Sequence, residues 1–233
     1  MLRVEDLHVA YGETEVVHGV TFRVDAGEAV AIIGSNGAGK TTVLRTVCGL
    51  LAARSGRVEF EDVSLTGRSA DRIARLGVAY VPAERHLFPG MSVAINLELG
   101  AYPKKPDPER FAYVYELFPR LKDRLAQLAG TMSGGEQQML AVGRALMAGP
   151  KLLMLDEPTT GLAPILAEEA YRALAQLRDD GDVTVLVAEQ QVPLALELAD
   201  RGYVLEDGRI QLEGRADDLE HNPDVQRAYL GIA

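Results

Sequence analysis

The sequence predicts an α/β fold with a mostly parallel sheet, and three observations support this prediction. Short, largely apolar runs recur along the chain, at residues 29–33, 152–155 and 183–188. Apolar runs of this length are typical of strands buried on both faces, as in parallel sheets. Stretches with helical apolar spacing follow these runs, such as residues 164–180. A glycine-rich loop at residues 34–41 joins the first run to a further helix.

Length and composition narrow the class of protein. A chain of 233 residues is long enough for one large α/β domain and too short for two. The net charge of −10 argues against nucleic acid as a partner, because nucleic-acid binders carry a basic face. The single cysteine, Cys48, excludes an intrachain disulfide framework and fits a reducing compartment. Without a signal-peptide pattern or an apolar run of about 20 residues, we expect a cytoplasmic protein that reaches a membrane only through another chain.

The first 86 residues predict a small antiparallel sheet beside the parallel one. Apolar residues recur along residues 2–9 and 16–24, and residues 55–63 are typical of a hairpin. A polar helix is expected near residues 71–76, and a buried strand follows at residues 77–81 before a proline ends it.

Tyr11 lies at the end of the first predicted strand and has two interpretations. Its ring could stack on an adenine, or it could be an ordinary tyrosine at a strand end. The residues around it favour neither interpretation.

The loop after the first apolar run has the composition of a phosphate-binding loop. It consists of Gly34, Ser35, Asn36, Gly37, Ala38, Gly39, Lys40 and Thr41, which match the pattern G-x-x-x-x-G-K-S/T. Glycines let backbone N–H groups turn toward phosphate oxygens, and the helix that follows adds its positive N-terminus. We expect Lys40 to reach the β- and γ-phosphates, Thr41 to ligate Mg²⁺ and Thr42 to lie close to the phosphates. A glycine-rich turn that binds nothing is the alternative, and the strand–loop–helix context argues against it.

From residue 87 to residue 150 the strand signals disappear. Helices are expected at residues 93–99, 108–117 and 122–128, with prolines between them. This pattern predicts an inserted helical subdomain at residues 87–150. The nucleotide-binding α/β core with its antiparallel sheet then consists of residues 1–86 and 151–233.

The helical stretch ends on a segment with a cap signature. Ser133 and Glu136 have the spacing of a capping box, so a helix is expected to start at Ser133 and run to residue 149. A plain capped helix does not explain Gly134 and Gly135, because glycine within a helix costs about 1 kcal/mol relative to alanine. We expect their backbone to approach an anion at the helix N-terminus.

Two carboxylates follow the apolar run at residues 152–155. Asp156 lies where an acid at the end of a neighbouring strand reaches the Mg²⁺ of a phosphate-loop site. Glu157 would then face the γ-phosphate and polarise an attacking water as general base. A solvated Asp-Glu turn is the weaker alternative. The strand at residues 183–188 brings residues 189–191 to the same edge of the sheet, where open α/β sheets bind ligands.

These motifs together carry a resemblance to a known family. The phosphate loop, Ser-Gly-Gly-Glu-Gln at 133–137 and Leu-Leu-Met-Leu-Asp-Glu-Pro at 152–158 resemble, in order and spacing, the nucleotide-binding subunits of ATP-binding cassette (ABC) transporters. Glu-Leu-Phe-Pro-Arg-Leu-Lys at 116–122 and Gly-Leu-Ala-Pro at 161–164 resemble the ATPases of branched-chain amino-acid importers. The resemblance implies a P-loop NTPase fold of the ABC ATPase type, with a mostly parallel RecA-like core, an N-terminal antiparallel β subdomain and an inserted α-helical subdomain.

The resemblance also implies roles for individual residues. In the family two subunits meet head to tail, and each ATP lies between one subunit's phosphate loop and the other's Ser-Gly-Gly-Glu-Gln segment. The implied ATP contacts come from Tyr11, from residues 34–42 and from Ser133, Gly134, Gly135, Glu136 and Gln137. The implied catalytic residues are Lys40, Glu157 and Gln190, and the implied Mg²⁺ ligands are Thr41 and Asp156.

The implied partners follow from the same resemblance. They are a second ABC ATPase subunit, which is a homologous chain or a second copy, and transmembrane permease subunits that dock on the helical subdomain and on residues 82–91. A solute-binding protein acts indirectly, and the complex places this chain on the cytoplasmic face of the membrane.

The sequence departs from the family pattern at three places. Ala83 stands where the broad family has a glutamine that contacts Mg²⁺, and Glu84 follows one residue late. Gln190 replaces a histidine that senses the γ-phosphate. A glutamine side chain can donate a hydrogen bond from its N–H but cannot take up a proton as histidine does. Ala163 replaces an aspartate that makes a contact between the two subunits.

Two classes of function are therefore considered. The first is an ATP-hydrolysing importer subunit for branched-chain amino acids, with urea or short amides as the alternative cargo. The second is a nucleotide-gated regulatory module with little hydrolysis, which is suggested by Ala83 and Gln190.

Overall fold

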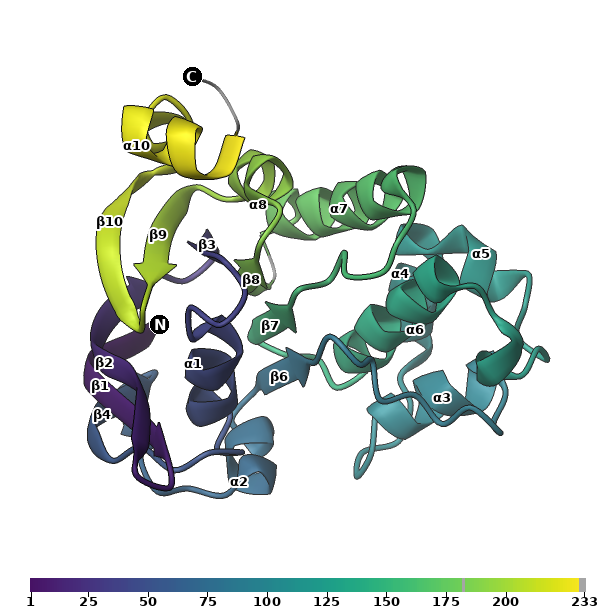
Figure 1. The fold of residues 1–233 in the computed structure, drawn as a ribbon. Coiled ribbons are helices and arrows are strands. Elements are labelled where there is room, and N and C mark those ends of the chain that lie inside the picture. The colour runs from purple at the N-terminus through teal and green to yellow at the C-terminus, as the bar shows by residue number, and fades with distance from the viewer. Residues whose placement is uncertain (182, 231–233) are drawn as a thin grey trace.

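The computed structural model describes residues 1–181 and 183–230, which form two sheets with helices packed around them (Figure 1). The larger sheet has the strand order β10-β9-β3-β8-β7-β6. Its strands are β3 (Ala29–Ile33), β6 (Val78–Val81), β7 (Leu152–Asp156), β8 (Thr184–Glu189), β9 (Arg201–Glu206) and β10 (Arg209–Arg215). Every neighbouring pair is parallel except β9 and β10. The predicted mostly parallel sheet is confirmed.

The smaller sheet is antiparallel, with the strand order β2-β1-β4-β5. Its strands are β1 (Leu2–Tyr11), β2 (Thr14–Val24), β4 (Ser55–Phe60) and β5 (Val63–Ser64). They cover the stretches in which the sequence predicts strands and a hairpin, because the apolar alternation there marks one buried face. The antiparallel sheet beside the parallel one is therefore confirmed.

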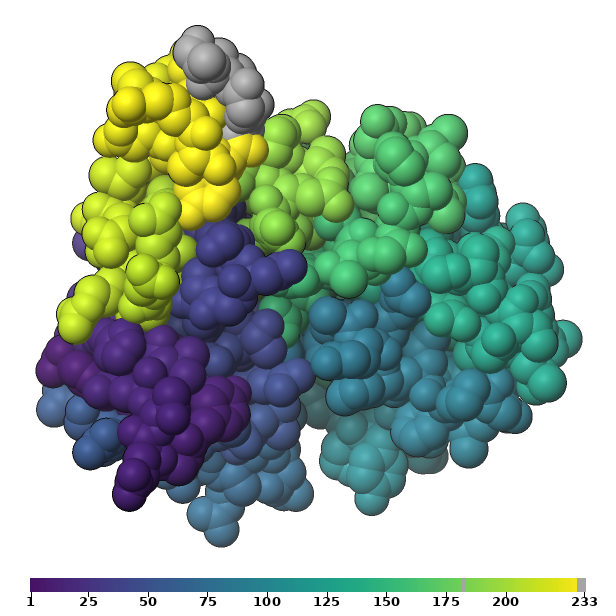
Figure 2. Space-filling model, viewed as in Figure 1, coloured from purple at the N-terminus to yellow at the C-terminus, as the bar shows by residue number. Residues whose placement is uncertain are grey.

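Most of the helices connect one strand to the next along the chain. They are α1 (Lys40–Val47), α2 (Ala70–Arg75), α3 (Val93–Gly100), α4 (Pro108–Leu117), α5 (Pro119–Lys122), α6 (Gly134–Leu146), α7 (Pro164–Asp179), α8 (Val192–Leu198), α9 (Ala216–Glu220) and α10 (Pro223–Val225), with a 3₁₀ turn at Ala129–Thr131 and a π-helical turn at Gln226–Leu230. Helices α3 to α6 gather on one side of the molecule, and the antiparallel sheet lies on the other (Figures 1 and 2). No helix in the described part of the chain is both long enough and apolar enough to cross a membrane.

The parallel sheet separates two hydrophobic cores. Along β3, Ala31 and Ile33 face the core formed with α6, α7 and α8, whereas Val30 and Ile32 face the core formed with α1 and the antiparallel sheet. Because side chains alternate along a strand, each buried run fills both cores. Cys48 lies in the second core, and burial raises the pKa of its thiol to about 11, as expected for an unreactive cysteine.

The prediction of a helix at residues 122–128 is wrong. The structure has the short helix α5 (Pro119–Lys122) and then turns. The carbonyl groups of Leu125 and Gln127 accept hydrogen bonds from Ala94 and Val93, at 3.1 and 2.9 Å. These carbonyls satisfy free N–H groups at the start of α3, so a tertiary contact overrides the local helical pattern.

Candidate nucleotide site

The parallel sheet brings three polar segments to one edge. Strands β3, β7 and β8 are neighbours, so the residues after their carboxyl ends lie side by side. Two backbone hydrogen bonds join these segments. Gly34 donates to the carbonyl of Glu189 at 3.3 Å, and Glu157 donates to the carbonyl of Ala188 at 2.8 Å. The loop, the acid pair and the segment after β8 thus form one continuous surface.

The loop at residues 34–39 wraps around a buried lysine. The Lys40 side chain is 3% exposed, and its ammonium donates to the carbonyls of Gly34 and Ser35, at 2.8 and 3.1 Å. A side chain at Gly34 is excluded, because its Cβ would lie 2.3 Å from the carbonyl oxygen of Leu205. Helix α1 begins at Lys40 without any side-chain cap. Its first N–H groups are therefore free of a cap and suited to an anion.

Tyr11 and Thr42 flank the loop. Tyr11 is 47% exposed, and its hydroxyl lies 3.4 Å from the Thr42 hydroxyl. The aromatic ring is therefore presented beside the loop rather than buried in either core. This position is compatible with the predicted contact to an adenine ring, which stays a prediction.

Asp156 binds two hydroxyl groups at the end of β7. The Thr41 hydroxyl donates to Oδ1 at 3.0 Å, and the Tyr80 hydroxyl donates to Oδ2 at 2.8 Å. Asp156 is buried, which raises the pKa of its carboxyl group, and the two hydrogen bonds oppose that effect. Mg²⁺ prefers oxygen ligands, and this pair of side chains offers a carboxylate and a hydroxyl oxygen side by side. The donor set of Thr41 and Asp156 therefore fits the metal predicted for it.

Glu157 lies between the loop and solvent. Its Oε1 is 3.2 Å from the Lys40 ammonium, and its Oε2 accepts a hydrogen bond from the Thr160 hydroxyl at 3.1 Å. The residue has a φ of 43°, in the left-handed region that non-glycine residues rarely adopt. Such backbone strain is concentrated at functional sites. The carboxylate is one-fifth exposed, so a water molecule can reach it.

Gln190 follows β8 and is exposed. Its backbone N–H donates to the Glu189 carboxylate at 2.8 Å, and its side-chain amide makes no hydrogen bond to any described residue. The amide is therefore free to reorient toward a ligand at the edge of the sheet.

Residues 133–137 form the N-terminus of α6, and the predicted capping box is confirmed. The Ser133 N–H and hydroxyl donate to Oε2 of Glu136 at 3.0 and 2.9 Å, and Arg124 lies 3.0 Å from Oε1. The Gln137 amide donates to the carbonyl of Ala129 at 3.1 Å. Glu136 and Gln137 are thus held by their own chain, whereas Ser133 is exposed.

The two glycines of this segment differ. A Cβ at Gly135 would lie 2.7 Å from Cδ1 of Leu166, so Gly135 allows α6 and α7 to pack closely. A Cβ at Gly134 would meet nothing nearer than 3.5 Å, from Arg85. The structure thus gives a packing reason for Gly135 only. No hydrogen bond or ion pair among the described residues joins this segment to residues 34–42.

Two site features were not anticipated from the sequence. Tyr80 reaches Asp156 because β6 and β7 are neighbours, and strand order has no local signal in the sequence. Arg85 donates to Gln138 and to the carbonyl of Thr160, both at 3.1 Å, and so joins α6 to the segment after Glu157. Glu84 is more than half exposed and lies 3.4 Å from Arg45.

Comparisons with known proteins agree with this geometry. The family model described as ABC transporter matches residues 17–160, which is more than half of the chain. The high-affinity branched-chain amino acid transport ATP-binding protein BraG of Pseudomonas aeruginosa is 48% identical, with 99% of this chain and 100% of that protein covered. The probable branched-chain amino acid transport ATP-binding protein LivF of Archaeoglobus fulgidus is 36% identical, with 100% and 99% covered. The crystal structure of an ATP-binding cassette of an ABC transporter, in its ADP conformation, aligns with a TM-score of 0.84 at 29% identity, covering 99% and 98% of the two chains. The chain belongs to the ABC transporter family, as one of its ATP-hydrolysing subunits.

Proposed function

We propose that this chain hydrolyses ATP in an importer of branched-chain amino acids. The observation that carries the proposal is the meeting of Lys40, Glu157 and the Thr41–Asp156 pair at one edge of the sheet. The cargo is inferred from the names of BraG and LivF, which are similar to this chain over almost its whole length. No other cargo has support of this kind, and urea or short amides stay an alternative from the sequence alone.

The loop suits the triphosphate of ATP. The ammonium of Lys40 is already buried and binds two carbonyls and Glu157. It can exchange these partners for phosphate oxygens without a further desolvation cost. The uncapped start of α1 supplies backbone N–H groups. Tyr11 flanks the loop and would hold the adenine by stacking.

Thr41 and Asp156 would hold Mg²⁺, which neutralises charge on the β- and γ-phosphates when it is bound. Tyr80 fixes the second oxygen of Asp156, so the first oxygen is kept toward Thr41. Asp156 is therefore oriented by hydrogen bonds before any ligand arrives, which is what a metal ligand needs.

Glu157 is the proposed general base. It would accept a proton from the water that attacks the γ-phosphate, while Thr160 holds its other oxygen. Lys40 beside it stabilises the charge on the transferred phosphoryl group. Gln190 would donate its amide N–H to the same phosphate.

The segment at residues 133–137 would complete the site of a second ATPase subunit. Ser133 is exposed at the start of α6, Gly134 is partly exposed, and residues 34–42 of the same chain make no bond to them among the described residues. An exposed helix N-terminus with an exposed serine suits the γ-phosphate of an ATP held by another subunit. ATP would thus be enclosed between two subunits.

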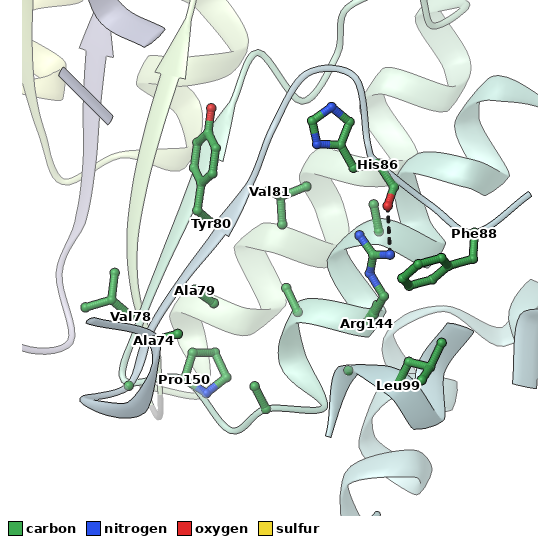
Figure 3. A pocket seen from close by; sticks show the side chains of 15 residues that line it. Ala74, Val78, Ala79, Tyr80, Val81, His86, Phe88, Leu99, Arg144 and Pro150 are labelled. Carbon is green, nitrogen blue, oxygen red and sulfur yellow. Dashed lines mark hydrogen bonds between the residues drawn. The ribbon is translucent and has the colours of Figure 1, made fainter. Parts of the chain in front are cut away.

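A hollow beside β6 is the proposed contact surface for the permease subunits. It has a volume of about 440 Å³ and is lined by residues of α2, β6, α3 and α6. Figure 3 shows Phe88, Leu99 and Pro150 around it, with Arg144 reaching the carbonyl of His86. Phe88 and Leu99 are 46% and 40% exposed, so part of the lining is exposed and apolar and suits an apolar segment of another chain. Tyr80 also lines this hollow and binds Asp156, so one side chain touches both surfaces.

The variant Glu157→Gln tests the proposal. It removes the base without changing the shape of the side chain, so we expect ATP binding to persist while hydrolysis falls by about 10²- to 10⁴-fold. In vesicles with the chain's permease and solute-binding protein, ATP-driven uptake of leucine should disappear with it. Unchanged hydrolysis by this variant would remove Glu157 from the mechanism. Uptake of urea but not leucine by the unmodified complex would correct the cargo, and no hydrolysis by that complex would favour the regulatory module.

A further inference from the structure

Glu189 is a buried acid that the scheme above does not use. It is 1% exposed at the end of β8, and its partners within residues 1–181 and 183–230 are uncharged N–H and O–H groups. The Tyr171 hydroxyl is buried nearby, and burial together with the charge of Glu189 raises the pKa of Tyr171. A buried carboxylate is costly unless hydrogen bonds satisfy it. A buried acid in this place therefore needs a physical reason.

The carboxylate of Glu189 binds two separate segments. Its Oε1 accepts hydrogen bonds from the backbone N–H of Thr159 at 3.2 Å and from the Thr159 hydroxyl at 2.5 Å. Its Oε2 accepts from the backbone N–H groups of Gln190 and Gln191, at 2.8 and 3.1 Å. The side chain of Gln191 closes the circuit by donating to the Thr159 hydroxyl at 3.0 Å.

The backbone of Glu189 binds a third segment. Its carbonyl accepts the N–H of Gly34, the first residue of the phosphate loop. Thr159 lies two residues after Glu157. The N–H of Glu157 donates to the carbonyl of Ala188, the residue before Glu189. One residue therefore touches the loop, the segment that carries Glu157 and the backbone of Gln190.

We propose that Glu189 is a positioning residue that holds the Glu157 segment and Gln190 in a fixed relation on either side of the γ-phosphate. The proposal rests on the proposed function for the roles of Glu157 and Gln190. Glu189 itself touches neither substrate nor metal in this scheme. It keeps Glu157 and Gln190 at fixed positions relative to each other, so a shift of one segment moves the other.

The chemistry of the contact requires a carboxylate. Each oxygen of Glu189 accepts two donors, so an amide at this position would turn its NH₂ group toward two donors in either orientation. Buried donors without an acceptor are strongly unfavourable. Glu189→Gln therefore disrupts one of the two arms while it keeps the volume of the side chain.

The test compares Glu189→Gln with Thr184→Val in the full chain. Thr184 is a matched control, because it is equally buried at the opposite end of β8 and accepts the N–H of Gly27 at 2.9 Å, away from the site. Hydrogen exchange of the nucleotide-free chain is followed at the amides of residues 159, 190 and 191. Thermal unfolding, ATP affinity and kcat are measured on the same variants.

We expect Glu189→Gln to raise exchange by about tenfold, as for one lost hydrogen bond, at residue 159 or at residues 190 and 191, whichever arm the new NH₂ group faces. ATP affinity should stay unchanged while kcat falls on the order of a hundredfold, because the reacting groups are misplaced. Thr184→Val should lower the melting temperature and leave kcat unchanged.

Two results would overturn the proposal. Wild-type exchange at the three amides in Glu189→Gln would show that the carboxylate does not hold the segments. Faster exchange with a kcat equal to that of Thr184→Val would show that it holds them without positioning the base. If Glu157→Gln hydrolyses ATP normally, the proposed function fails, and the exchange comparison alone then decides whether Glu189 joins the two segments.

Discussion

The phosphate loop and residues 133–137 are held in opposite ways. The loop lies at the centre of the parallel sheet, where Lys40 is buried and the turn of the β9–β10 hairpin supports the loop through the hydrogen bond from Gly208 to Ala38. Residues 133–137 form a helix start whose polar groups are satisfied by their own capping box and by Arg124. The loop lies beside the other site residues of its own chain. No hydrogen bond or ion pair among the described residues joins residues 133–137 to those residues.

This difference separates ATP binding from ATP hydrolysis. The loop, Asp156 and Glu157 are oriented by contacts within one chain, so a single chain should bind ATP. The exposed Ser133 is proposed to meet a phosphate held by another subunit, so hydrolysis should need two subunits. Substitutions in the two regions should therefore produce different losses.

The largest effect is expected at the loop. Lys40→Ala removes the ammonium that would bind the phosphates, so both ATP binding and hydrolysis should fall, with a loss in kcat of about 10²- to 10³-fold. Binding of a fluorescent ATP analogue and steady-state hydrolysis check this expectation. Unchanged nucleotide binding would mean that Lys40 does not contact the phosphates.

A more selective effect is expected at the exposed glycine. Gly134→Asp places a negative charge where the phosphate of a second subunit's ATP would lie, while an acid in the first turn of a helix is favourable for folding. We expect hydrolysis to fall about tenfold or more through charge repulsion, with unchanged ATP binding by the isolated chain. Gly134→Ala is the matched control and should lose less hydrolysis than Gly134→Asp, because it adds no charge. Equal activity of both variants would contradict a shared site.

The smallest effect on hydrolysis is expected at the second glycine. Gly135→Ala forces a Cβ against Leu166, and overpacking of this kind costs about 1–3 kcal/mol of stability. Thermal unfolding should show a lower melting temperature for Gly135→Ala than for Gly134→Ala. ATP binding at the loop should be unaffected where both variants are folded. Equal melting temperatures would mean that α6 shifts to accept the methyl group.

Local rules made much of the fold predictable from the sequence. The buried strands, the loop before α1 and the capping box of Ser133 and Glu136 all follow from apolar periodicity or from fixed short spacings. The roles of the site residues stay predictions, although the structure places the loop, Asp156, Glu157 and Gln190 at one edge of the sheet.

The features that escaped prediction depend on contacts between distant segments. Tyr80 binds Asp156 only because β6 lies next to β7, and Gly135 is needed only because Leu166 packs over it. The segment at residues 123–128 is not helical because its carbonyls bind the start of α3. Each depends on tertiary packing, which local propensity does not specify.

The dependence of ATPase rate on protein concentration tests the central claim most directly. A chain that holds one half of each site should bind ATP when dilute but hydrolyse it slowly, and the rate per chain should rise with concentration or on addition of a partner ATPase subunit and permease. Glu157→Gln should meanwhile accumulate as a dimer with ATP. A rate per chain that is constant on dilution, and equal to that of the assembled complex, would show that one chain completes its own site and would contradict this account.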